Sequence, residues 1–562
     1  MDLSSANNRT VVADTVRGGT LAPFPVEIIL HILTNLSYRD LFRCARVCKF
    51  LHDVVNRAVQ LLYTAELQAE GFVDFADVHG NIPVRDRLKM VIRHAQAWRT
   101  LSWKTQASVG LRKSGSLQIV NGTLVCQTLD FIDRIPHKKN YLFQLSLDTL
   151  DEKLFEDDYD DELFDTYQSF DVGQDLLVLG NVGFRRDNAG NFVQPVVARH
   201  RLRLRTLSSN GSSQHPDASH EALLLSFDAP SPGTVSSLVR IAGTLVGVIV
   251  QHATQGFCIA LWNWRTGHML VDLENPLNRM PLCDFCFLSQ SQIMLVCSAP
   301  PDLFLEVWSL DPDSAAVNND RPLLRLSLPD LGIETYTWFS FSHGPFQSDV
   351  NQGVPFIKRP DARMYAVITQ RNDERPTPLL CIVFHHDTIL ALLQNNEPAS
   401  EEHPKTVRWS EWGPHGTRMF LRSQPPWGNL NTGWVYNERL VGTFATSTIA
   451  DSDGEGDFSE TEQILDFNVR PYMPQSAAAS ELGLAEGKGQ LITEPTTLAL
   501  PVNYRRRTVE ITTSLPYYSI PVDVPDENRY VGVLIDEQHL LGLKAGNGRS
   551  RIPIGFDVFT FE

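Results

Sequence analysis

The sequence predicts a small helical module at the N-terminus, a helical linker, and then a large body built from β-strands alone. Apolar residues recur at helical spacing in residues 21–57, and helix-forming sequence continues through residues 58–105. From about Gln106 the chain turns to short apolar runs separated by Gly, Asp, Asn and Pro. Many short strands without intervening helices are typical of a sandwich, barrel or propeller. We therefore expect a multidomain α + all-β chain whose body, residues 106–562, is an irregular β-propeller.

Composition excludes several function classes. A chain of 562 residues with 43% apolar content is too long for one ordinary core. The 49 basic against 66 acidic residues give a net charge of −17, which argues against a nucleic-acid partner. The basic runs are short: Arg201 to Arg205 alternates like a strand, and Arg505 to Arg507 is typical of a solvated face.

The sequence also predicts a compartment. The N-terminus has neither a basic start nor a following apolar run, and residues 1–20 are expected to form a flexible tail. The longest apolar run, Ile241 to Val250, is too short to cross a bilayer. Eight cysteines without a framework spacing favour a reducing environment. We expect no membrane partner and a cytoplasmic or nuclear location.

The helical module begins with a broad apolar stripe. Pro25 suits the first helical position, and Glu27 complements the positive helix end. The stripe that follows consists of Ile28, Ile29, Ile32, Leu33 and Leu36. It is too wide for a surface helix with a single neighbour. Ser37 with Asp40 then predicts a capped start to a second helix. A three-helix unit this small rarely buries enough surface to be stable alone, so it needs a partner chain, the downstream part of its own chain, or both.

These residues resemble the F-box pattern, which is leucine-proline-x-glutamate, then aspartate-leucine, then valine-cysteine-lysine. The matching positions are Phe24-Pro25, Glu27-Ile28-Ile29, Ile32, Leu36, Asp40-Leu41 and Val47-Cys48-Lys49. Phe24 stands where the family usually has leucine, and Leu51 where it often has tryptophan. The resemblance implies binding to the Skp adaptor of a cullin-based (SCF) ubiquitin ligase. The alternative is an ordinary N-terminal helical hairpin that caps the larger domain and binds no partner.

The resemblance also implies which residues contact the adaptor. The candidates are Phe24, Pro25, Ile28, Ile32, Leu36, Leu41, Val47, Cys48 and Lys49. The sequence alone leaves open which of them face the adaptor and which pack internally.

The sequence of the linker predicts that it packs tightly against the body. A helix should end at Gly71, and another should begin after Pro83. Three large apolar side chains then follow at the junction: Trp98, Leu101 and Trp103. Such side chains need burial, so we expect them to fix the module against the strands that follow.

Two segments favour a propeller over other β architectures. Thr244 to Val250, Cys258 to Trp264 and His268 to Leu273 read as three strands joined by short turns. Gln292 to Cys297 and Leu303 to Leu310 repeat the first two. This arrangement resembles a degenerate WD-repeat blade that lacks the aspartate of the WD dipeptide. Six to eight blades fit the length, with seven favoured. Two β-sandwiches or a β-solenoid are the alternatives.

Two acidic stretches are expected to be inserted loops. They lie near residues 148–165 and 450–489, where like-charge repulsion favours a solvated chain. The first could attract a basic partner, and Ser452 and Ser459 in the second could suit an acid-directed kinase.

No motif predicts a catalytic, cofactor or metal site. Cys283 and Cys286 have metal-ligand spacing, but no second ligand pair accompanies them. His385 and His386 are adjacent at a strand end and should point apart. We therefore expect a non-enzymatic adaptor that binds Skp, through it cullin, and an unidentified protein substrate. The alternatives are a Skp-binding scaffold without a role in ubiquitination and an enzyme with its site in the propeller mouth.

Overall fold

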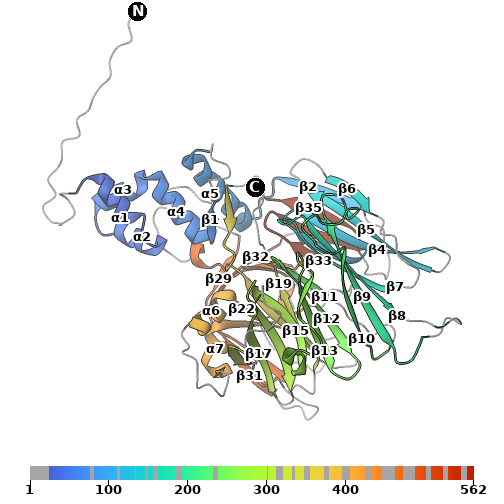
Figure 1. The fold of residues 1–562 in the computed structure, drawn as a ribbon. Coiled ribbons are helices and arrows are strands. Elements are labelled where there is room, and N and C mark those ends of the chain that lie inside the picture. The colour runs from blue at the N-terminus through green and yellow to red at the C-terminus, as the bar shows by residue number, and fades with distance from the viewer. Residues whose placement is uncertain are drawn as a thin grey trace, which may run out of the picture.

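The structure is a computed structural model of the full chain (Figure 1). It describes residues 24–75, 82–110, 114–132, 135–145, 150–155, 163–184, 187, 192–231, 238–299, 302–311, 321–331, 336–346, 355–371, 379–394, 405–423, 433–445, 462–472, 488–501, 508–522, 530–545 and 553–561. The predicted tail, residues 1–20, lies outside these ranges.

Five helices open the chain. They are α1 (Val26–Leu33), α2 (Tyr38–Ala45), α3 (Lys49–Arg57), α4 (Val59–Glu70) and α5 (Val84–Thr100). The sequence predicts that Pro25 is the first residue of α1, but the helix begins one residue later, at Val26, and Pro25 precedes it. Ser37 begins α2 as predicted, and its hydroxyl oxygen accepts a hydrogen bond from the Asp40 N–H at 3.2 Å. The Asp40 carboxylate accepts from the Ser37 hydroxyl at 2.7 Å and does not complete the second half of a capping box.

Helix α4 joins the module to the linker because it carries two apolar stripes. Leu61, Ala65 and Ala69, spaced four apart, pack into the core of α1–α3. Tyr63 and Leu67 face the other way and pack against α5 and the short strand β1 (Phe72–Asp74). One helix is therefore part of both units, and the module has no flexible joint at this point.

The body consists of seven sheets of four or five strands among the described residues. The first holds β3 (Ser114–Val120), β4 (Thr123–Ile132), β5 (Ile135–Leu145) and β6 (Leu150–Phe155). The second holds β7 (Leu163–Asp171), β8 (Leu176–Phe184), β9 (Val197–Thr206) and β10 (Ala222–Asp228). The third holds β11 (Leu238–Ala242), β12 (Leu245–His252), β13 (Gly256–Asn263) and β14 (His268–Val271). Each follows chain order and is antiparallel throughout.

The remaining sheets are less regular. The fourth holds β15 (Leu282–Ser289), β16 (Gln292–Ala299), β17 (Asp302–Ser309), β18 (Leu324–Ser327) and β23 (Thr406–Val407). The fifth holds β19 (Tyr336–His343), β21 (Met364–Arg371), β22 (Leu379–His385), β24 (Thr417–Arg422) and β27 (Phe444–Ala445). The sixth holds β25 (Val435–Tyr436), β26 (Arg439–Gly442), β28 (Gln463–Asp466), β32 (Tyr517–Pro521) and β29 (Gln490–Ile492).

The seventh sheet joins both ends of the body. It holds β33 (Tyr530–Ile535), β34 (His539–Ala545), β35 (Pro553–Thr560) and, next to β35, the early strand β2 (Thr105–Gly110). Thr105 pairs with Thr560, and Gly110 pairs with Gly555. The first strand of the body thus completes its last sheet, which fastens the two ends of the chain together.

Shared apolar cores close these sheets into a ring. One buried cluster joins the first and second sheets, and others join the second to the third, the third to the fourth, and the fourth to the fifth. A large cluster then spans the fifth, sixth and seventh sheets. A further cluster joins the seventh sheet back to the first. A ring of sheets packed face to face is the propeller-like arrangement that the sequence predicts. The blade number of seven stays a prediction, which the seven described sheets support.

The linker packs firmly on this ring, between it and α1–α3 (Figure 1). Strand β1 pairs with β20 (Phe356–Lys358), and the Lys358 ammonium donates to the Glu70 carbonyl at 2.6 Å. Trp98 of α5 is fully buried, stacks on Phe561 with ring centroids 4.0 Å apart, and donates its indole N–H to the Glu537 carbonyl. The three helices of the module therefore project from the β-body on a rigid support.

Burial of the linker side chains differs from expectation at one position. Trp98 and Leu101 are buried as predicted, but Trp103 is 38% exposed. Its ring lies only against Phe559, at 4.8 Å. Trp103 precedes β2, which is the outermost strand of its sheet.

The β-body also contains two short helices that the sequence analysis does not predict. They are α6 (His386–Gln394) and α7 (Trp409–Gly416). Both are short, and α7 contains Pro414, so neither offers the long helical periodicity by which helices are recognised. His386 starts α6 directly after β22, so the predicted histidine pair lies at a strand–helix junction.

The acidic stretches are not wholly loops. Residues 150–155 form β6 and residues 163–165 begin β7, while 156–162 lie outside the described residues. In the second stretch, Gln463–Asp466 is strand β28, and 450–461 and 473–487 lie outside them, with Ser452 and Ser459. Strand β6 pairs only with β5, and an outermost strand tolerates charge because one edge stays open to water.

Candidate partner-binding surface

The module has a small but complete core of its own. Its buried members are Ile29, Leu33, Tyr38, Leu41, Ala45, Leu51 and Val55, together with Leu61, Ala65 and Ala69 of α4. The backbone N–H of Tyr38 also donates to the Gln68 side chain at 2.7 Å, which fastens α2 to α4. Ile29 and Leu33 form the inward face of α1, so the adjacent face of that helix is left over.

This leftover face is apolar and exposed. Ten large apolar side chains are exposed among the described residues, and six of them belong to the module. These six, which we call the apolar surface, are Phe24, Val26, Ile28, Ile32, Val47 and Phe50. Ile28 and Ile32 are 47% and 49% exposed and lie one turn apart on α1. Such a concentration of exposed apolar side chains is typical of a surface that contacts another molecule.

The predicted contact residues divide into two groups. Phe24, Pro25, Ile28, Ile32, Val47, Cys48 and Lys49 are all exposed. Leu36 is half-buried against the module core, and Leu41 is only 3% exposed. Leu41 therefore needs correction as a contact residue: it holds α2 onto α4, because it lies on the inward face of α2. Val26 and Phe50 also belong to the apolar surface but are not among the predicted contact residues. In the sequence they cannot be told from apolar residues of the core.

Charged side chains border the apolar surface, among them the exposed Glu27, Arg46 and Lys49. Asp40 accepts hydrogen bonds from the Ser37 hydroxyl and from Arg43, and these hold the pKa of its carboxyl below its usual range. The Asp40–Arg43 ion pair is exposed, at 2.9 Å. The lone Lys49 at the start of α3 is the remaining exposed charge among the predicted contacts. The surface thus combines an exposed apolar centre with charged neighbours, as protein contact surfaces commonly do.

Residues 24–64 match the family model described as F-box-like. The module is an F-box-like module. The match begins at the apolar surface and ends inside α4, so it covers the three helices and the first half of the helix on which they pack. No curated protein matches the sequence.

Solved structures resemble this chain only weakly. The WD40 domain of SCAP from fission yeast is 6% identical and covers 81% of this chain and 98% of its own, with a TM-score of 0.30. The Nup133 β-propeller domain of Vanderwaltozyma polyspora is 8% identical over the same shares, with a TM-score of 0.29. Oligopeptidase B from Leishmania major is 8% identical and covers 62% of this chain and 38% of its own, with a TM-score of 0.26. At such scores these likenesses carry no argument, and the propeller-like class rests on the sheets themselves.

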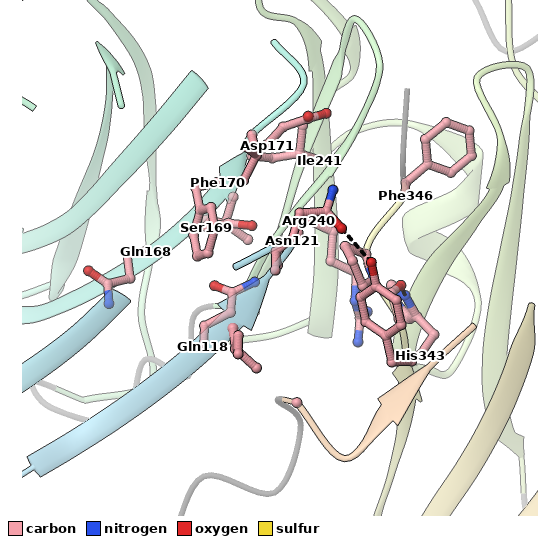
Figure 2. A pocket seen from close by; sticks show the side chains of 18 of the residues that line it. Gln118, Asn121, Gln168, Ser169, Phe170, Asp171, Arg240, Ile241, His343 and Phe346 are labelled. Atoms are coloured by element: carbon pink, nitrogen blue, oxygen red, sulfur yellow. Dashed lines mark hydrogen bonds between the residues drawn. The ribbon is translucent and has the colours of Figure 1, made fainter. Parts of the chain in front are cut away.

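A second candidate site lies on the axis of the β-body. A cavity of about 90 Å³ is lined by β3, β7, β11, β19 and β25, each the first strand of its sheet. Figure 2 shows Gln118, Asn121, Arg240 and His343 grouped around it from three different sheets. Arg240 is engaged: it donates to both Asp284 oxygens, at 2.5 and 3.0 Å, and to the Phe341 carbonyl at 3.1 Å.

The other polar groups around this cavity are the Asp171 carboxylate and several side chains without a formal charge. Burial and the charge of Arg240 lower the pKa of His343 to about 3, so its ring is uncharged at neutral pH. Its Nδ1 lies 2.6 Å from the Gly344 carbonyl, and the Tyr436 hydroxyl donates to Asn121. The lining residues include no Ser, Cys or Thr hydrogen-bonded to a base in the arrangement that activates a nucleophile. The cavity therefore offers hydrogen-bonding groups but no activated nucleophile among its lining residues.

Of the two cysteines with metal-ligand spacing, Cys286 is buried and Cys283 is partly buried. Burial raises the pKa of Cys283 to about 12, with Asp284 adding to the shift, and it raises the pKa of Cys286 further. Both belong to β15. Within the described residues, no group of three or more His, Cys, Asp or Glu side chains is placed to hold a metal ion. In the same ranges, no helix has the length and apolar content to cross a membrane.

Proposed function

We propose that the protein is the substrate-recruiting subunit of an SCF-type ubiquitin ligase. The apolar surface of the F-box-like module binds a Skp-type adaptor, and through it a cullin. The observation that carries this proposal is the placement of six of the ten exposed large apolar side chains on a module that already has a complete core. Those side chains cannot be covered by their own module, so a second protein covers them.

The β-body holds the target in this proposal. A ring of sheets offers a broad face and an axial cavity for that contact. The chain itself makes or breaks no bond. It raises the effective concentration of a target near a ligase-bound ubiquitin carrier, which requires a fixed distance between the two binding sites. The rigid linker supplies that distance.

The test measures adaptor affinity with a matched surface control. We expect the Ile28→Ser, Ile32→Ser double variant of the full chain to lose about a hundredfold or more in affinity for a purified Skp-type adaptor, because each anchor contributes about tenfold. Leu224→Ser is the control, since Leu224 is an exposed leucine of β10 outside the module. Calorimetric titration measures both. Equal affinity of the double variant and the wild type would rule out the apolar surface as the contact.

A second measurement separates a ligase subunit from a scaffold. The wild-type chain, captured from cells, should bring down cullin and support ubiquitin transfer to a co-captured protein. The double variant should lose cullin and retain partners of the β-body. Capture of the adaptor without cullin or ubiquitin transfer would favour the scaffold.

A further inference from the structure

An apolar groove runs along the outside of the β-body, far from the module. It lies between α7 and a hairpin made of β30 (Thr496–Pro501) and β31 (Thr508–Thr513), and has a volume of about 450 Å³. Figure 1 places α7 and β31 next to each other at the edge of the body opposite the N-terminal helices. The volume falls within the range of sites that bind a small ligand or a short peptide segment.

The apolar part of the groove lining consists of one indole ring, three proline rings and aliphatic side chains. Trp409, Pro414, Pro329 and Pro495 line it, with Val509 and Ile511 of β31. Trp409 is half-buried and stands edge-on to Trp412, with ring centroids 5.4 Å apart. Its ring rests on Gly413 so closely that a Cβ there would lie 2.3 Å from ring atoms. The indole is thus held in a fixed position by residues beneath it.

Two polar features accompany these rings. The indole N–H of Trp409 has no hydrogen-bond partner among the described residues, whereas the neighbouring Trp412 donates to the Ser327 carbonyl at 2.9 Å. Glu510 places an exposed carboxylate on the rim, and none of the described residues that line the groove is a lysine or an arginine. The groove therefore offers a fixed donor and a negative rim beside an apolar floor.

We propose that this groove binds a proline-rich segment of a partner protein in the polyproline II conformation, with a basic residue beside the prolines. Proline rings stack on the indole and on other apolar rings, and polyproline II recognition uses grooves of this kind. That conformation leaves its carbonyls without internal hydrogen bonds, so one can accept from Trp409. A helix satisfies its own carbonyls and would leave this donor unused. The negative rim selects the flanking basic residue.

The test uses three labelled peptides and the full chain. The first is octaproline followed by two arginines, the second is decaproline, and the third is octa-alanine followed by two arginines. Fluorescence anisotropy should show saturable binding of the first, weaker binding of the second, and none of the third. Failure of both proline peptides to bind, or equal binding of the alanine peptide, overturns the proposal. The latter result would indicate a helical or purely electrostatic ligand.

Variants then assign the contact. Trp409→Ala should weaken binding of the first peptide about tenfold or more, and Trp409→Phe, which keeps a ring but removes the N–H, by several-fold. Glu510→Lys should reduce the affinity for the arginine peptide and leave decaproline unaffected. Trp103→Ala, at an exposed tryptophan elsewhere, is the matched control. Wild-type affinity of Trp409→Ala would overturn the assignment. Thermal unfolding and adaptor affinity, which depends on other helices, report whether each variant is folded.

Discussion

At the scale of single residues, burial decides what each side chain of the module does. Ile28 and Leu41 are both apolar and both belong to the F-box pattern, yet the first is 47% exposed and the second 3%. Removing Ile28 should change binding, and removing Leu41 should change folding. Substituting Ile28 and Leu41 one at a time therefore distinguishes binding from folding, which the sequence pattern does not.

Leu41→Ala should destabilise the module by about 3 kcal/mol, because it leaves a cavity between α2 and α4. Ile28→Ala should alter stability by less than about 0.5 kcal/mol, since its side chain is largely in water. Amide hydrogen exchange in α1–α4 measures both. Equal loss of protection in the two variants would contradict the division into core and surface.

Glu66 of α4 gives the module a dependence on pH. Burial raises the pKa of Glu66 to about 7 from 4.5, and the neighbouring Glu70 adds to the shift while Arg99 opposes it. The folded state therefore holds a proton that the unfolded state has released between these values. The contribution of Glu66 to stability is fully present below about pH 4.5 and is lost as the pH rises through 7.

Glu66→Gln should remove this dependence, because glutamine stays neutral. We expect the variant to be more stable than the wild type by about 1–2 kcal/mol at pH 8, with the difference shrinking toward pH 5. Urea unfolding at the two pH values measures it. A stability difference that is the same at both would show that Glu66 does not titrate in this range.

At the scale of elements, α5 and β1 connect the F-box-like module to the β-body. Besides Trp98, the junction holds Glu537, whose carboxylate oxygens lie 3.2 Å from His94 and 2.7 Å from the Asn437 amide donor. Burial alone would raise the pKa of Glu537, but the hydrogen bond with His94 and the charges of Lys358 and Arg439 outweigh burial and lower it. The junction thus contains an ionised, fully engaged carboxylate beneath a buried tryptophan.

Trp98→Ala should loosen this junction and cost about 3–5 kcal/mol of local stability. Adaptor affinity should remain near the wild-type value, because the apolar surface lies on α1 and α3 and in the turn between α2 and α3. Ubiquitin transfer to a bound target should fall, since the distance between the two sites is no longer fixed. Limited proteolysis between α5 and β2, with calorimetric titration of the adaptor, measures the two effects. If Trp98→Ala lowered both the stability of the junction and the affinity for the adaptor, the two functions would not be separate.

At the scale of the whole molecule, pairing of β2 with β35 closes the ring. Gly555 lies opposite Gly110 in this pair, and a Cβ on Gly555 would meet the Val109 carbonyl oxygen at 2.5 Å. A Cβ on Gly110 would meet nothing within 4 Å. The two glycines are thus neighbours with opposite tolerance for a side chain.

Gly555→Ala should push β2 away from β35 and destabilise the body by about 1–3 kcal/mol, because the clash is with backbone that cannot rotate away. Gly110→Ala should change stability by less than about 0.5 kcal/mol. Thermal unfolding of the full chain measures the pair. A Gly555→Ala variant as stable as Gly110→Ala would show that closure of the ring does not depend on this contact.

Much of this architecture could be predicted from local patterns. The capped start at Ser37, the helix end at Gly71 and the strands around Trp264 depend on residues close together in sequence. The F-box-like pattern is local as well, and it covers positions 24–64. Periodicity and capping act within a few residues, so the sequence itself contains them.

The tertiary structure decided what those patterns could not. Leu41 and Ile28 have the same local pattern, and only the packing of α4 against α2 buries one and leaves the other exposed. The pairing of β2 with β35, the two faces of α4, and the groove between α7 and β31 each join segments far apart in the chain. The sequence determined the N-terminal helices and most of the strands, because their propensities are local, but not the short helices α6 and α7. Which surfaces remain uncovered depends on contacts between distant segments, and only the folded chain fixes those.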